Sequence, residues 1–186
     1  MDLDFATLPT CTRCDLSLTR QRVVIGSGPL HAALVVVGEA PGRAEDEGGE
    51  PFVGRSGRLL FQLIDEEIGL ARSACFVTNA VKCRPPMNRP PRQRELDACR
   101  PWLLAQLGQA RAPVVLALGA TAARAVFGLR ESIGDVHGRV RDLGLARGVV
   151  TYHPAAALRA GPRVLEVLRA DLRVVRALVH ASRGPA

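Results

Sequence analysis

The sequence predicts an α/β fold in which a mainly parallel, four-stranded sheet is covered by helices on both faces. Short apolar runs rich in β-branched residues recur along the chain, and each is too short for a typical helix. Segments with apolar residues at helical spacing stand between these runs, as expected when helical crossovers join parallel strands. The 186 residues suit one domain, residues 1–186, with a core large enough to need no second one.

Each predicted strand delivers a residue suited to a binding site. Glu39 follows the first strand, and Asn79 lies near the end of the second. Gly119 closes the third strand, and His153 follows the fourth. Because the carboxyl ends of parallel strands meet at one edge, these residues should converge where ligands bind in open α/β sheets. The predicted strands are 33–37, 75–81, 114–119 and 148–152.

The helices are predicted from apolar side chains that recur on one face. Ser56 can cap the first helix, and Gly69 can end it in a left-handed conformation. The last helix carries Leu168, Leu172 and Val175 on its apolar face. Residues 133–147 lack periodicity and are interpreted as a hairpin. The predicted helices are 56–69, 95–107, 121–127 and 164–179.

The loop at 38–54 carries five carboxylates, with Phe52 set among glycines that allow the backbone to approach a ligand closely. It leaves the carboxyl end of a buried strand, and this position favours a site. The alternative is a solvated acidic loop that buries one phenylalanine.

The net charge of +7 favours an acidic partner such as nucleic acid, although a solvated basic face would give the same charge. Of the 25 basic residues only Lys82 is a lysine, so a Schiff-base mechanism has one side-chain candidate. No apolar run reaches the roughly 18 residues of a membrane span, and the first residues do not resemble a signal peptide. We therefore expect a cytosolic protein that does not bind membranes.

The five cysteines of a cytosolic chain favour metal ligation, catalysis or burial over disulfides. Cys11 and Cys14 form a Cys-x-x-Cys turn that can hold one metal centre, and Cys83 and Cys99 can complete a set of four. Cys75 lies within a predicted strand and is interpreted as a core thiol. Spacing alone does not separate zinc from an iron–sulfur centre, nor either from buried or redox-active thiols.

The segment 82–94 combines prolines, which prevent regular structure, with arginines and Lys82. It is interpreted as a surface that contacts phosphates, and Lys82 as a phosphate contact or a packing residue. The alternative is a solvated linker.

Several motifs together resemble family 4 uracil-DNA glycosylases. They cover about residues 11–159 and stand in the order of that family. The resemblance implies a three-layer α/β/α fold, a [4Fe–4S] cluster held by the four cysteines named above, and excision of uracil from single- or double-stranded DNA. The motifs are Gly38-Glu39-Ala40-Pro41-Gly42 with Glu45-Asp46, Pro51-Phe52-Val53-Gly54, Thr78 to Pro86, Cys99-Arg100-Pro101-Trp102, Leu118-Gly119-Ala120 and His153-Pro154.

The resemblance also implies roles for individual residues. Phe52 would stack on an extruded uracil, and Asn79 would bond its O4 and N3–H edge. His153 would stabilise negative charge on the departing base, helped by backbone amides at Glu39 and Ala40. Either Glu39 or Glu45 would orient water, and the sequence leaves that choice open. Pro41 completes the substrate-binding set, and the DNA-binding set is Arg84, Arg89, Leu158 and Arg159.

Two departures from the family pattern matter. Family members often have His-Pro-Ser followed by paired leucines, whereas Ala155 and Ala157 here leave Leu158 as the single bulky candidate for a wedge. The related branch that becomes covalently trapped on uracil-DNA uses a loop histidine, and the loop 83–94 contains none. The missing histidine favours turnover over trapping. We also expect a monomer, and a monofunctional enzyme because Lys82 is the only lysine. The competing interpretations are a trapping relative and a zinc-stabilised protein that binds nucleic acid without catalysis.

Overall fold

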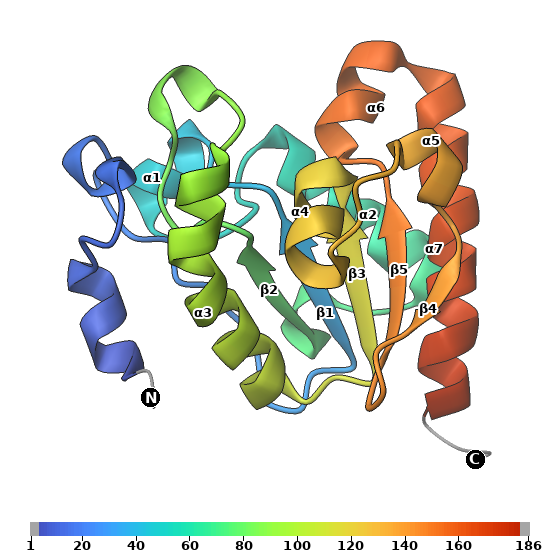
Figure 1. Cartoon of the computed structure of the whole chain (residues 1–186). Coiled ribbons are helices and arrows are strands. Elements are labelled where there is room, and N and C mark those ends of the chain that lie inside the picture. Colours follow the sequence, from blue (N-terminus) through green and yellow to red (C-terminus); the bar gives the residue numbers. More distant parts are fainter. Residues whose placement is uncertain (1–3, 183–186) are drawn as a thin grey trace.

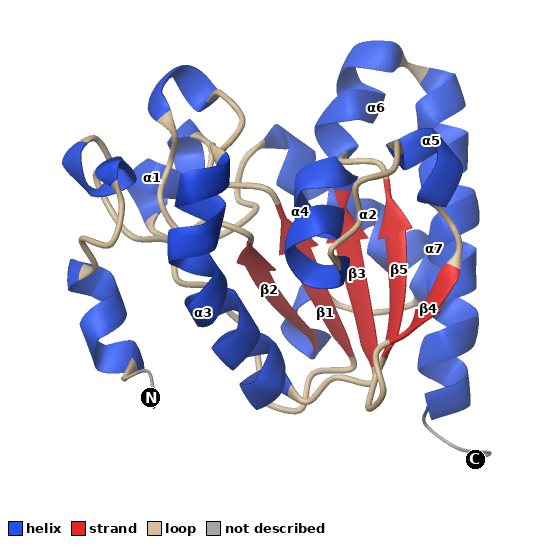
Figure 2. Cartoon of the chain, viewed as in Figure 1, coloured by secondary structure: helices blue, strands red, loops and turns tan. Residues whose placement is uncertain are grey.

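The computed structural model describes residues 4–182 and contains one five-stranded sheet in the order β2-β1-β3-β5-β4 (Figure 2). The four predicted strands are present and run parallel to one another. All side chains of the two central strands β1 and β3 are buried, because helices cover both faces of the sheet. The strands are β1 Leu34–Gly38, β2 Cys75–Asn79, β3 Val114–Leu118, β4 Val140–Asp142 and β5 Arg147–Thr151.

The sheet has one short edge strand more than the four that the sequence predicted. The hairpin predicted within residues 133–147 is present, and its first strand, β4, pairs antiparallel with β5. β4 has only three residues, and two of them are exposed, so it has no apolar periodicity that the sequence could reveal. A four-residue helix, α5 (Ile133–Val136), precedes it.

Two helical layers enclose the sheet and confirm the α/β/α architecture (Figure 1). Behind the sheet in this view lie α2 (Arg55–Ile68), α6 (Pro154–Ala160) and α7 (Pro162–Ser182). In front lie α3 (Gln93–Ala110), α4 (Gly119–Phe127) and α5. Alternate strand residues face the two layers: Leu34 and Val36 pack with the first group, and Val35 and Val37 with the second. None of the helices within residues 4–182 is long and apolar enough to cross a membrane.

The amino-terminal segment forms two short 3-10 helices, Phe5–Thr10 and Asp15–Leu18, which lie beside α3 (Figure 1). Leu8 and Leu16 are buried in a small core of their own, together with Trp102 of α3. A third short element, α1 (Arg43–Gly48), lies within the acidic loop. The sequence predicted none of the three, because each is too short to show helical periodicity.

The turn between α1 and α2 brings Phe52 back toward the sheet. Phe52 has a φ of 58°, a left-handed conformation that is unusual for a bulky residue. The chain then folds so tightly that a Cβ atom on Gly57 would lie 1.9 Å from the Phe52 carbonyl oxygen. Only glycine fits at position 57 without movement of this turn.

We predict that Gly57→Ala destabilises the protein by about 3 kcal/mol, the upper end of the usual cost of overpacking, because the added methyl group overlaps backbone atoms that cannot rotate away. Gly108→Ala is the matched control. Gly108 lies within α3, and a Cβ atom there meets nothing within 4 Å. That change should stabilise the protein by up to about 1 kcal/mol through helix propensity. Urea unfolding of both variants measures the difference, and equal stabilities would contradict the packing described for Phe52.

Candidate active site

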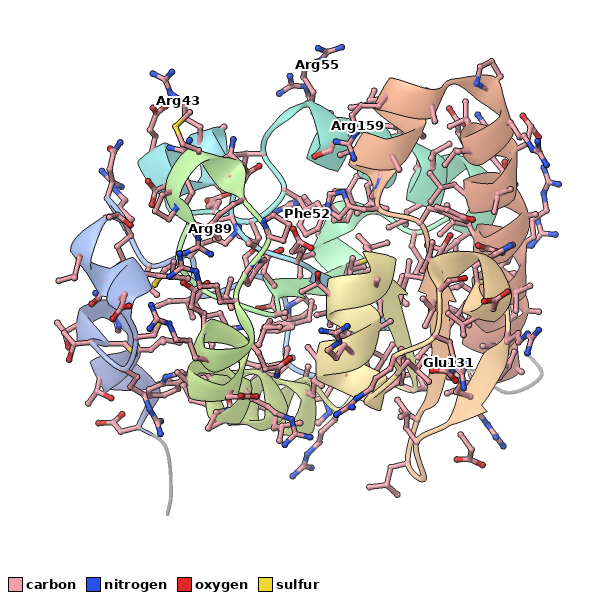
Figure 3. All side chains as sticks on the ribbon, turned by 45° about the horizontal axis from the view of Figure 1, so that its top comes forward. Arg43, Phe52, Arg55, Arg89, Glu131 and Arg159 are labelled. Atoms are coloured by element: carbon pink, nitrogen blue, oxygen red, sulfur yellow. The ribbon has the colours of Figure 1, made fainter. Side chains whose placement is uncertain are left out.

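A cavity of about 490 Å³ opens at the carboxyl edge of the sheet. Loops that follow β1, β2, β3 and β5 all contribute to its wall, as the sequence predicted. In Figure 3, which brings this edge toward the viewer, Phe52 lies between Arg89 and Arg159. The predicted residues that line the cavity are Glu39, Ala40, Pro41, Glu45, Phe52, Asn79, Arg89, His153 and Arg159. Arg84 and Leu158 do not line it, and the four cysteines line a separate pocket.

Only one of the two carboxylate oxygens of Glu39 has a hydrogen-bond partner within residues 4–182. The Thr121 hydroxyl, on the first turn of α4, donates a short hydrogen bond to Glu39 Oε2. The second carboxylate oxygen, Oε1, has no hydrogen-bond partner within residues 4–182. The carboxylate is therefore fixed in orientation, and one oxygen remains available in the cavity.

Glu45 is buried, and the backbone occupies both of its oxygens. Oε2 accepts from the Gly42 amide at 3.0 Å, and Oε1 accepts from the Gly54 amide at 2.8 Å. The side chain thus fastens the two ends of the acidic loop together, although it also reaches the cavity wall. The neighbouring Asp46 also binds the backbone: its Oδ1 accepts hydrogen bonds from the amides of Gln21 and Arg22.

Phe52 and Asn79 meet at Gly38, the last residue of β1. A Cβ atom on Gly38 would lie 2.5 Å from Cζ of Phe52 and 2.4 Å from Oδ1 of Asn79. Glycine at this position lets the ring and the amide approach the strand end closely. Asn79 is paired in register with Gly38, and its side-chain amide has no hydrogen-bond partner among the described residues. A flat apolar face and a free amide therefore border the same space.

His153 begins α6, and its ring stacks near Phe52 with centroids 6.1 Å apart and planes at 24°. Its Nδ1 accepts from the Ala155 backbone amide at 3.2 Å, which places the ring proton on Nε2. Burial, and secondarily the charge of Arg159, lower the pKa of His153 to about 4, although Glu45 acts in the opposite direction. The imidazole is therefore neutral at pH 7 and can donate from Nε2 into the cavity.

The arginines of the predicted DNA surface differ in how they are held. Arg89 makes a bidentate ion pair with Glu95, in which its two terminal nitrogens donate to the two carboxylate oxygens at 2.6 and 2.9 Å. The Glu95 carboxylate is fully buried. Arg84 donates to the Asn88 side chain at 2.7 Å. Arg159 is exposed on α6 at the cavity rim and has no acidic partner within the described part of the chain. The loop between Cys83 and α3 is thus held in one conformation instead of being a free linker.

The exposed apolar side chains near the cavity are Leu158 and Met87. Leu158, on α6, is 45% exposed, whereas Met87, in the short 3-10 turn Pro86–Asn88, is 93% exposed. Met87 has a φ of 55° and precedes Asn88, which lines the cavity. The sequence analysis did not select Met87, because a methionine between prolines and an asparagine carries no motif.

Several residues that shape the site were not selected from the sequence, and Thr121, which holds Glu39 without lining the cavity, is the clearest of them. It stands near the beginning of a predicted helix, where a threonine gives no sign that its hydroxyl orients a carboxylate across the chain. Tyr152 is contiguous with His153, and that adjacency is the only signal that the sequence offered. Ser56, Ile133 and Tyr152 are among the unselected residues that line the cavity itself.

Cys11, Cys14, Cys83 and Cys99 line one small pocket beside the amino-terminal turns. The structure thus brings together the four predicted ligands, while Cys75 lies in the sheet core, away from them. Burial raises the pKa of Cys83 to about 11, against the charge of Arg20, whose guanidinium donates to the Cys83 sulfur at 3.5 Å. Within residues 4–182 no three His, Cys, Asp or Glu side chains are close enough to share a single metal ion.

Lys82 is buried with 1% of its surface exposed, which agrees with the packing role among its two predicted alternatives and not with the phosphate contact. Its ammonium donates to the Thr78 hydroxyl at 2.7 Å and to the Asn79 backbone carbonyl at 2.6 Å. Burial lowers the pKa of Lys82 to about 8, and the nearby thiols of Cys99 and Cys83 oppose that shift. Lys82 therefore packs between the cavity and the cysteine pocket.

Comparison with known proteins agrees with this geometry. The model of the uracil DNA glycosylase superfamily matches residues 25–173. A type-4 uracil-DNA glycosylase of Thermotoga maritima is 44% identical over 161 residues, which are 86% of this chain and 83% of the relative. That of Pyrobaculum aerophilum is 42% identical over 161 residues, 82% and 81% of the two chains. That of Saccharolobus solfataricus is 40% identical over 184 residues, 95% and 85%. With a matching superfamily model and such relatives over most of its length, the chain belongs to the type-4 uracil-DNA glycosylases.

Proposed function

We propose that this protein hydrolyses the N-glycosidic bond of uracil in DNA and so starts base-excision repair. One observation carries the proposal: a free carboxylate oxygen, an aromatic face, an unpaired amide and a neutral imidazole border a single cavity. The proposal takes the chain as one domain that acts as a monomer on single- or double-stranded DNA. It places this activity in the cytoplasm of a bacterium or archaeon.

Recognition begins when the target nucleotide leaves the base stack, because its glycosidic bond is inaccessible within a duplex. Uracil would enter the cavity and stack on Phe52. The unpaired Asn79 amide would donate to O4 and accept from N3–H, whereas cytosine has a donor at C4 and no proton on N3. The donor and acceptor of the Asn79 side-chain amide would therefore select uracil over cytosine.

Bond cleavage leaves positive charge on the sugar and negative charge on the departing uracil. Because His153 is neutral and carries its proton on Nε2, it would donate a hydrogen bond from Nε2 to uracil O2 as negative charge develops there. The backbone amide of Ala40, in the cavity wall, would add a second donor. These groups would stabilise charge on the leaving group.

Water would be oriented by Glu39 in preference to Glu45. Glu39 keeps one oxygen without a partner, whereas both oxygens of Glu45 accept backbone hydrogen bonds. The Glu39 carboxylate would also stabilise the cationic sugar electrostatically. Glu45 would contribute by holding the loop that carries Glu39 and Phe52.

DNA would lie across the rim formed by α6 and the loop 84–92. Within residues 4–182 no carboxylate pairs with Arg159 or Arg84, and both would contact phosphates. Arg89 would act chiefly through its ion pair with Glu95, which fixes the loop. Leu158, which is 45% exposed, would enter the space left in the stack by the extruded base.

We further propose that Cys11, Cys14, Cys83 and Cys99 hold a [4Fe–4S] cluster. The four thiols line one pocket, yet no three potential ligands in the described chain are close enough for a single ion. This spacing suits a cluster better than zinc, because each thiolate of a [4Fe–4S] centre binds a different iron atom. When bound, the cluster would supply metal–thiolate bonds that crosslink the amino-terminal turn, the start of the basic loop and α3. It would take no part in bond cleavage.

We predict that the purified protein releases uracil from a uracil-containing duplex, and that the strand breaks only after alkali or heat. A matched cytosine duplex should remain intact. Borohydride added during the reaction should trap no protein–DNA adduct, because the ammonium of Lys82, the chain's only lysine, is buried and hydrogen-bonded to Thr78 and Asn79. An adduct that disappears in Lys82→Ala would show that the enzyme is bifunctional.

We predict that Glu39→Gln and Glu45→Gln fail in different ways. Glu39→Gln should lower the single-turnover excision rate by roughly 10²- to 10⁴-fold with little change in stability, because it removes the group that orients water. Glu45→Gln puts an amide donor against a backbone amide and should lower stability by about 1 to 3 kcal/mol. Rates measured well below each melting temperature separate the two effects. The reverse pattern would assign water orientation to Glu45.

We predict that Cys83→Ala loses bound iron and its broad visible absorption, while Cys75→Ala keeps both. Both thiols are buried, so loss of packing is similar in the two variants. Iron content per protein and the visible spectrum are the measurements. Stoichiometric zinc in place of iron in the wild-type protein, or a full iron complement in Cys83→Ala, would refute the ligand assignment.

A further inference from the structure

The only lysine of the chain is a buried cation with two hydrogen-bond acceptors. Its ammonium donates to the Thr78 hydroxyl and to the Asn79 carbonyl, both of which are buried. A buried ammonium destabilises a protein strongly unless opposite charge and hydrogen bonds compensate it. The two acceptors supply hydrogen bonds but no negative charge.

Among the described residues no carboxylate pairs with Lys82, whose two hydrogen-bond partners are both neutral. Lys82 lines the same pocket as the four cysteines. Thiolates that bind a cluster are deprotonated, so a bound cluster would supply the negative charge that the lysine lacks.

The segment from Asn79 to Cys83 also joins the two sites through the backbone. The Ala80 amide donates to the Gly38 carbonyl at 2.8 Å, and the Val81 amide donates to the Glu39 carbonyl at 3.2 Å. Asn79, at one end of this segment, faces the cavity, and Cys83, at the other end, faces the cysteine pocket. A movement of Lys82 would therefore displace both Asn79 at the cavity and Cys83 at the cysteine pocket.

We propose that Lys82 is a positioning residue that couples the cysteine site to base recognition, because its ammonium holds the Asn79 carbonyl while the cluster thiolates balance its charge. The inference rests on the proposed function of both sites. Loss of the cluster would leave a buried cation without counter-charge. The strand end would then open to water, and the Asn79 amide would lose its fixed direction toward the cavity.

Lys82→Met tests the coupling, because methionine keeps most of the length of the side chain and removes the charge and all three donors. Removing a positive charge beside the cluster should shift its reduction potential to more negative values. Losing the anchor of Asn79 should weaken inhibition by free uracil by roughly tenfold, a change of about 1.4 kcal/mol. Lys82→Arg, which keeps the charge, should return the potential toward the wild-type value. Cys75→Ala, a buried substitution outside both sites, should change neither quantity.

The wild-type protein is measured first, since absence of iron or of uracil release there would refute the proposed function and not the coupling. If the wild type has both, an unchanged potential or an unchanged uracil inhibition constant in Lys82→Met overturns the coupling. If Lys82→Met does not fold, Thr78→Val replaces it, since this change keeps the ammonium but removes one of its two acceptors. Thr78→Val should weaken uracil inhibition at an unchanged potential, and wild-type inhibition by that variant overturns the proposal.

Discussion

The close approach of an aromatic ring and an amide to the end of β1 is the constraint on which the cavity depends. The Phe52 ring and the Asn79 side chain occupy the space that any side chain at position 38 would need. The same ring is held by a left-handed backbone at Phe52 and by a turn that admits only glycine at position 57. A flat floor therefore exists at the sheet edge before any ligand arrives, and a planar ligand would meet it without rearrangement.

Buried charged side chains hold the two loops that follow β1 and β2 beside that floor. Glu45 joins the ends of the acidic loop, Glu95 anchors the basic loop through Arg89, and Lys82 holds the segment after β2. In each case an ionised side chain binds the backbone or a single opposite charge, so the loop is fixed although it has little apolar surface of its own. Charges at this edge thus serve two purposes: the buried ones hold the backbone, and the exposed Arg159 has no acidic partner among the described residues and remains available to a partner.

The long elements and the convergence of the strand ends could be predicted from the sequence, because buried strands and the terminal helix carry strong apolar periodicity. The edge strand β4, the helix α1 and the two amino-terminal turns could not, because each is too short to show a period. The gathering of Glu39, Asn79 and His153 followed from the position of each beside a strand end, and Phe52 was expected there because it belongs to the loop that leaves the first strand. The difference between Glu39 and Glu45, the pairing of Arg89 and the burial of Lys82 depend on partners distant in sequence, which spacing does not reveal.

The described surface carries arginines but no exposed lysine, and this limits the reagents that can be used to probe the protein. Since Lys82 is the only lysine and is 1% exposed, reagents that attack lysine side chains find no target on the described surface of the folded protein. Amine-directed crosslinking through lysine would therefore under-report its contacts with DNA. In turn, covalent labelling of this one side chain would measure how often the segment between the two sites opens to solvent, so a single residue serves as a built-in probe of local unfolding.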